Sequence, residues 1–166
     1  GQRLISQPIK GTSVRLVNDK ELDQAQRDYL LGSQKERSEN VMVVDLVRND
    51  LARICMEGSV KVDELFGIYS FPQVHQMIST ISGELRPGND FVDIIRATFP
   101  MGSMTGAPKR KVMQLIEKYE QSRRGLFSGA VGYISPGGDF DFNVVIRSVL
   151  YNADQRYLSF STGSAI

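Results

Sequence analysis

The sequence predicts an α+β fold with largely antiparallel sheets and helices packed on them. Strand-like segments are mixed with irregularly placed helices along the 166 residues. Two short sequences near the C-terminus, Pro-Gly-Gly-Asp at 136–139 and Asn-Ala-Asp-Gln at 152–155, are typical of hairpin loops. Both observations favour antiparallel pairing of the strands.

The chain is expected to begin with a strand over 2–7 and a turn over 8–12. A helix is predicted to start after Asp19, a good N-cap residue, and to run over 20–37. Residues 40–54 continue this helix or start a new one. Apolar side chains cover several faces of 40–54, so this segment is predicted to be well buried.

Strands are predicted next over 59–68 and 74–85, where the second is enriched in Ile and Thr. A short helix over 90–97 is expected to be capped by its first residue, an aspartate. Another helix is predicted after Pro108, because apolar residues there repeat at helical spacing. Three strands are predicted to close the chain: 129–135, 140–150 and 156–162.

Composition excludes several classes of protein. Lys and Arg number 20 against 19 Asp and Glu, and 41% of residues are hydrophobic, which is near the globular average. The balanced charge gives no electrostatic reason to expect nucleic acid or an anionic membrane surface as a partner. The apolar runs are too short to predict a membrane-spanning helix. Cys55 is the only cysteine, so no internal disulfide is predicted and a reducing, cytoplasmic setting is expected.

Lys10 is the first residue that could carry chemistry. It lies in Pro-Ile-Lys-Gly-Thr at 8–12, where proline fixes the backbone and glycine allows close approach to a ligand. A desolvated lysine in such a segment could act as a nucleophile. From these five residues alone, a solvated turn lysine is the commoner interpretation.

Glu36 and Glu39 form the second candidate. A spacing of three places both carboxylates on one helix face, which favours a divalent, oxygen-seeking cation such as Mg²⁺. Lys35 and Arg37 flank the pair, and a solvated charged face is the commoner explanation of such a cluster.

The third candidate is the loop 102–109, in which two glycines and hydroxyl groups, Ser103 among them, precede a helix. Free backbone N–H groups make such a loop receptive to an anion, although its spacing differs from that of a phosphate-binding loop. A plain capped helix entrance is the alternative.

Arg147, which follows an apolar strand run, is the fourth candidate. It could bind a carboxylate through two hydrogen bonds, and an internal Asp or Glu partner explains it equally well. His75 is expected to be a packed or surface histidine. Asp45, Arg48 and Asp50 are expected to cap the helix and to pair with one another.

Several motifs occur in one order: Pro-Ile-Lys-Gly-Thr at 8–12, Lys-Glu-Arg-Ser-Glu-Asn at 35–40, Val-Asp-Leu-Val-Arg-Asn-Asp at 44–50, the loop 102–109, and Ser-Gly-Ala-Val-Gly-Tyr at 128–133. This set resembles the chorismate-utilising enzymes over nearly the whole chain, and the resemblance implies their fold. Lys10 and Asn40 resemble the aminodeoxychorismate synthase branch, because anthranilate synthases, the alternative, usually carry Ala and His there.

The resemblance also implies roles for individual residues. Lys10 would add to C2 of chorismate and be displaced by ammonia entering at C4, giving 4-amino-4-deoxychorismate for para-aminobenzoate and folate biosynthesis. A glutamine amidotransferase partner would supply the ammonia. Glu36 and Glu39 would hold the Mg²⁺ that binds the ring carboxylate. The residues implied to contact the substrate are Gly11, Thr12, Gln76, Ser103, Phe127, Arg147 and Gly163.

The sequence departs from the family pattern at three positions: Gln76 replaces a catalytic His, Phe127 a Tyr, and Ala165 a Gly. These changes leave open a non-catalytic relative. The family's second pair of metal-binding glutamates and its general-acid glutamate have no counterpart here. We therefore expect 1–166 to be a single segment of a catalytic domain that lacks both ends, and to be inactive by itself.

Overall fold

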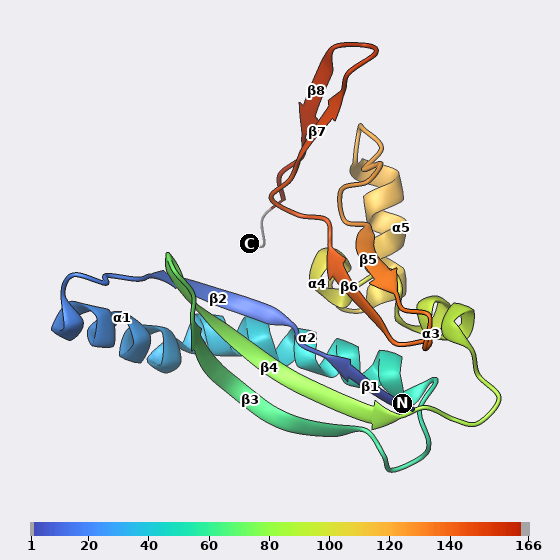
Figure 1. Cartoon of the computed structure of the whole chain (residues 1–166), viewed down its shortest axis with the longest axis horizontal. Helices are drawn as coiled ribbons and strands as arrows, with labels where there is room; N and C mark the ends of the chain where they lie inside the picture. The colour runs from blue at the N-terminus through green and yellow to red at the C-terminus, as the bar shows by residue number, and fades with distance from the viewer. Residues whose placement is uncertain (1, 164–166) are drawn as a thin grey trace. The chain divides into compact units, whose positions relative to one another are not determined.

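The computed structural model describes residues 2–163, which form two compact units (Figure 1). The first unit spans Gln2–Lys109, and the second contains the described residues from Arg110 onward. Every strand pairing within the described residues is antiparallel, and helices accompany the main sheet. The predicted α+β class is therefore confirmed.

The sheet of the first unit is built around one long central strand. The strands are β1 Arg3–Ser6, β2 Ile9–Val14, β3 Lys61–Ser70 and β4 Val74–Glu84. β1 and β2 pair with successive parts of β4, and β3 pairs with β4 along most of its length (Figure 1). The predicted turn over 8–12 is wrong, because Ile9–Thr12 belong to β2. A register shift between Ile9 and Thr12, with Gly11 at φ +99°, forms a bulge that keeps the strand paired.

Two helices follow β2: α1 Lys20–Gly32 and α2 Gln34–Ala52. Asp19 caps α1 as predicted, since its carboxylate accepts hydrogen bonds from two backbone N–H groups of the first turn, at 3.1 and 3.0 Å. The predicted helix over 20–37 is wrong at its end. Ser33 has an extended conformation, terminates α1 and caps α2, so the helices are separated at this residue.

The core of the first unit lies between α2 and the sheet. Its buried apolar side chains include Leu30, Val43, Val44, Leu51, Met77, Ile78 and Ile81. The expectation that 40–54 is buried is correct for one face only, because Val41 and Met42 are 46% and 39% exposed. An amphipathic helix lying on a sheet buries the face that it turns to the strands.

Three shorter helices follow the sheet: α3 Phe91–Thr98, α4 Gly102–Thr105 and α5 Lys109–Tyr119. Asp90 and Asp93 form a reciprocal capping box at the start of α3, which confirms the predicted cap. The helix predicted after Pro108 is α5. The sequence did not predict α4, a single turn within the loop 102–109.

The second unit contains two hairpins in addition to most of α5. Their strands are β5 Ala130–Ile134, β6 Phe140–Val144, β7 Val149–Asn152 and β8 Tyr157–Phe160. Both predicted hairpin loops are confirmed. The single strand predicted over 140–150 is wrong, because the chain leaves the extended conformation at Arg147, where φ is +52°. In the described part of the chain, no helix is long and apolar enough to cross a membrane.

Candidate functional site

Lys10, Glu36 and Glu39 meet where the bulge of β2 lies against the first turns of α2. Lys10 Nζ lies 3.7 Å from Glu39 Oε2. Lys35 Nζ lies 3.8 Å from a carboxylate oxygen of Glu36 and 3.8 Å from one of Glu39. The side chains of Lys10, Glu36 and Glu39 are 22–24% exposed, so this group of charges is half-buried and still reachable from solvent.

Gly11 allows the strand to approach the helix this closely. An added Cβ at Gly11 would lie 3.1 Å from Leu30 Cδ1 and 3.2 Å from Glu36 Cβ. The positive φ at this position is also one that other residues rarely adopt. The glycine therefore sets the distance between Lys10 and the two glutamates.

A buried polar pair, Asn40 and Ser79, lies behind the bulge. Both residues are fully buried. Ser79 Oγ donates a hydrogen bond to Asn40 Oδ1 at 2.6 Å, and Asn40 Nδ2 donates to the carbonyl oxygens of Lys10 and Met77 at 3.4 and 3.5 Å. In the sequence, Asn40 indicates only a branch of the family. Ser79 is not predicted as a functional residue, and its one signal is a hydroxyl inside an apolar strand.

The remaining predicted residues of the first unit lie on neighbouring elements. Thr12 and Gln76 are register partners on β2 and β4. Ser103 is in α4, which packs on α2 so closely that an added Cβ at Gly102 would lie 2.8 Å from Leu46 Cβ. The structure thus places Thr12 and Gln76 side by side, and it places Ser103 on a helix that contacts α2.

His75, beside Gln76, is a packed histidine. Its ring is fully buried, with Nε2 2.9 Å from Asp23 Oδ1 and Nδ1 2.9 Å from Ser70 Oγ. The backbone N–H of Leu16 and the His75 ring lower the pKa of Asp23 below its usual value. This cluster connects α1 to the end of β3 and the start of β4.

Ion pairing along α2 follows the expectation in part. Asp45 and Arg48 pair at 3.4 Å as predicted. Asp50 instead pairs with Lys109 Nζ at the start of α5. Burial raises the pKa of the Asp50 carboxyl, and the hydrogen bond from Lys109 opposes that rise.

In the second unit the structure brings Phe127 and Gly163 together, since an added Cβ at Gly163 would lie 3.6 Å from Phe127 Cζ. Arg147 is exposed in the segment between β6 and β7, and not within the strand predicted over 140–150. Within residues 2–163 its guanidinium has no ion-pair partner, so the internal Asp or Glu partner is not found there. Ala165 lies outside the described residues.

Glu36 and Glu39 offer only part of the set of ligands that a metal ion needs. Among residues 2–163 no group of three or more His, Cys, Asp or Glu side chains could hold a metal ion. Glu36 and Glu39 nevertheless offer half-buried carboxylate oxygens on one helix face, which are the ligands that Mg²⁺ prefers. The donor set fits Mg²⁺ if further oxygen ligands come from water or substrate.

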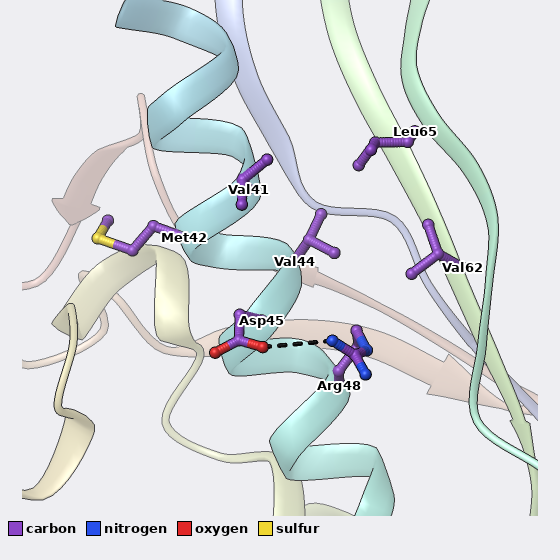
Figure 2. Close-up of a pocket in the computed structure, with 7 residues that line it drawn as sticks. All are labelled: Val41, Met42, Val44, Asp45, Arg48, Val62 and Leu65. Carbon is purple, nitrogen blue, oxygen red and sulfur yellow. Dashed lines mark hydrogen bonds and ion pairs between the residues drawn. The ribbon is translucent and has the colours of Figure 1, made fainter. Parts of the chain in front are cut away.

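A separate pocket of about 450 Å³ opens between α2 and β3 (Figure 2). Its lining residues are Val41, Met42, Val44, Asp45, Arg48, Val62 and Leu65. The Asp45–Arg48 ion pair lies at its edge, and the other lining side chains are apolar. None of the predicted site residues lines this pocket, so it is distinct from the group around Lys10.

Comparison with known proteins gives consistent matches. Aminodeoxychorismate synthase component 1 of Salmonella typhimurium is 45% identical over 158 residues, covering 95% of this chain and 35% of the relative. Anthranilate synthase component 1 of Aquifex aeolicus is 43% identical over 149 residues, covering 90% and 30%. The crystal structure of anthranilate synthase component I from Streptococcus pneumoniae superposes with a TM-score of 0.77 at 35% identity, covering 89% of this chain and 32% of that one.

The chain spans about a third of the length of these relatives. The structural match agrees with the fold that the resemblance implied. The sequence profile of the chorismate binding enzymes matches residues 1–166. The chain therefore belongs to the chorismate binding enzyme family.

Proposed function

We propose that the protein carrying this chain is an aminodeoxychorismate synthase component 1, which converts chorismate and ammonia to 4-amino-4-deoxychorismate. The observation that carries this proposal is the placement of Lys10 Nζ 3.7 Å from Glu39, at the edge of the two-glutamate group. Several aminodeoxychorismate synthase relatives match at 42–45% identity, which supports this branch more than the anthranilate synthase alternative, although one anthranilate synthase matches at 43%. The amine at position 10 and the amide at position 40 favour the aminodeoxychorismate branch.

In the proposed reaction the Lys10 amine forms a bond to C2 of the ring, the ring double bonds shift, and the C4–O bond breaks. The leaving hydroxyl takes up a proton from a general acid and departs as water. Ammonia then forms a bond to C4, the double bonds shift back, and the C2–N bond to Lys10 breaks. The lysine is regenerated, so it is a catalyst.

Glu36 and Glu39 are proposed to hold Mg²⁺, which when bound supplies positive charge for the ring carboxylate of chorismate. Their half-buried oxygens on one helix face support this assignment. Lys10 and Lys35 offset the negative charge of the pair when the metal is absent. Chorismate is a dianion, and its second carboxylate is assigned to the exposed guanidinium of Arg147.

The remaining contacts are proposed in two groups. Gly11, Thr12, Gln76 and Ser103 are assigned to substrate contacts from the first unit. Phe127 and Gly163, which lie together, are assigned to substrate contacts from the second unit. Gln76 can donate a hydrogen bond but cannot exchange protons near neutral pH as the family histidine can. A cytoplasmic glutamine amidotransferase subunit is proposed to supply ammonia for para-aminobenzoate and folate synthesis.

The test is Lys10→Ala in the intact protein, with Lys61→Ala as a control because Lys61 is an exposed lysine on β3. Removing the nucleophile is expected to lower C4 amination by about 10³-fold or more, as for other covalent catalysts. Lys61→Ala is expected to retain the parent rate. Product formation is followed by chromatography with ammonia as nitrogen donor. Unchanged amination by Lys10→Ala would rule out covalent lysine.

Two alternatives remain, and each has its own observation. The structural match to an anthranilate synthase favours that activity, and formation of anthranilate from chorismate would identify it. Gln76 and Phe127 favour a non-catalytic relative. Calorimetric titration with chorismate, with and without Mg²⁺, separates this case, because a non-catalytic module is expected to show no Mg²⁺-dependent heat.

A further inference from the structure

Asn40 and Ser79 connect the bulges of two strands through the core. The backbone N–H of Phe66 donates to Ser79 Oγ at 3.1 Å, and Ser79 Oγ donates in turn to Asn40 Oδ1 at 2.6 Å. Phe66 has φ +61° and lies in an irregular part of β3. At the other end of the chain of hydrogen bonds, Asn40 Nδ2 faces the Lys10 carbonyl oxygen in the bulge of β2.

The orientation of the Asn40 amide is fixed by its neighbours. Ser79 Oγ accepts a hydrogen bond from the Phe66 N–H and donates its single hydrogen to Asn40 Oδ1. The reversed amide would place Oδ1 against the carbonyl oxygens of Lys10 and Met77, which cannot donate. Only one orientation satisfies all the groups, and it directs Nδ2 at Lys10.

Regular pairing of β2 with β4 is interrupted around Lys10. The register between β2 and β4 shifts between Ile9 and Thr12. On the preceding side the backbone N–H of Ser79 donates to the Pro8 carbonyl at 3.2 Å. The backbone of Ser79 thus holds the chain at Pro8, just before Lys10. The side chain of Ser79 orients the Asn40 amide, which faces the Lys10 carbonyl.

We propose that Asn40 is a positioning residue for Lys10, with Ser79 orienting its amide. The pair fixes the backbone of the bulge so that the Lys10 amine projects toward Glu39, as the 3.7 Å separation requires. This inference deepens the proposed function, since it assigns to a buried amide the alignment of the nucleophile. A misplacement of about 1 Å at a reacting atom can lower a rate by about 100-fold.

The experiment compares Asn40→Leu and Ser79→Ala with Val43→Ala in the intact protein. Val43 is equally buried on the same helix and makes no side-chain hydrogen bond, so it controls for lost core packing. The two test variants are expected to lower kcat by roughly 10- to 100-fold with KM for chorismate nearly unchanged. Val43→Ala is expected to keep the parent kcat at a comparable loss of Tm.

A second measurement does not depend on turnover. Lys10 and Lys61 are acetylated with a limiting amine-reactive reagent, and the two labelled peptides are quantified by mass spectrometry. Lys10 is 22% exposed in the parent, so releasing the bulge is expected to raise labelling of Lys10 relative to Lys61 in Ser79→Ala and Asn40→Leu, and not in Val43→Ala.

An unchanged labelling ratio in both test variants, or equal kcat losses in all three variants, would overturn the positioning role. Failure of the proposed function gives a different pattern. In that case Lys10→Ala retains amination, while the labelling ratio still reports whether Asn40 holds the bulge. If Asn40→Leu does not fold, Ser79→Ala decides the matter by both measurements.

Discussion

At the scale of single residues, Gly11 combines two constraints that are usually met separately. Its φ of +99° strains any other residue, and the space beside its Cα is occupied by Leu30 and Glu36. Gly88 has a similar φ of +86° with no atom within 4 Å of an added Cβ. Substitutions at the two glycines therefore distinguish the effect of backbone strain alone from the effect of strain combined with crowding.

Gly88→Ala is expected to lower the free energy of unfolding by roughly 1–3 kcal/mol, the usual cost of left-handed backbone in a residue with a side chain. Gly11→Ala is expected to lower the free energy of unfolding further, because the added methyl group also displaces α1 or α2. The same displacement is expected to reduce amination. Urea unfolding monitored by circular dichroism measures both variants. Equal losses at the two positions would show that β2 is not closely packed on α2.

At the scale of elements, the Lys109–Asp50 pair connects the start of α5 to the end of α2. Asp50 is 8% exposed and Lys109 17%. A buried carboxylate without its partner carries a large desolvation cost, which here already raises the pKa of Asp50. The effects of Asp50 and Lys109 on stability are therefore expected to be strongly coupled.

Lys109→Met is expected to destabilise the protein by about 3 kcal/mol, the lower end of the cost of breaking a buried pair. Asp50→Asn in the same chain is expected to recover much of that loss, because the uncompensated charge is removed. A double-mutant cycle of thermal unfolding measures the coupling between the two side chains. Additive losses would mean that the two side chains are not coupled.

The elements that sequence periodicity predicted are mostly present, and two of the errors share a cause. β3, β4, α3 and α5 follow local patterns of apolar residues and caps. The turn predicted over 8–12 and the strand predicted over 140–150 failed where a single residue adopts positive φ, at Gly11 and Arg147. Such a residue makes a bulge in one case and a break in the other, and the outcome depends on the neighbouring strand.

At the scale of the whole molecule, the sequence predicted individual functional side chains better than the residues that position them. Glu36 and Glu39 were recognisable because helical spacing alone places them together. The approach of Lys10 to Glu39 required the family motif, since β2 and α2 are separated by α1. The Asn40–Ser79 hydrogen bond joins residues 39 positions apart, and no local pattern indicates it.

The 166-residue polypeptide is expected to show no turnover by itself. Within the described residues the proposed Mg²⁺ site has two carboxylates, and the chain spans about a third of its relatives. The purified polypeptide is incubated with chorismate, Mg²⁺ and ammonia, and the products are separated by chromatography. Detection of 4-amino-4-deoxychorismate would contradict this expectation.

The central position of β4 has a consequence for biosynthesis. Arg3 pairs with Glu84 and Val14 with Val74, so β1 and β2 both pair with a segment that the ribosome makes later. Contacts between residues so distant along the chain form slowly, because a long loop must close first. During translation β1 and β2 therefore cannot pair with β4 until it has left the exit tunnel, and a nascent chain stalled before Val74 lacks this partner for both strands.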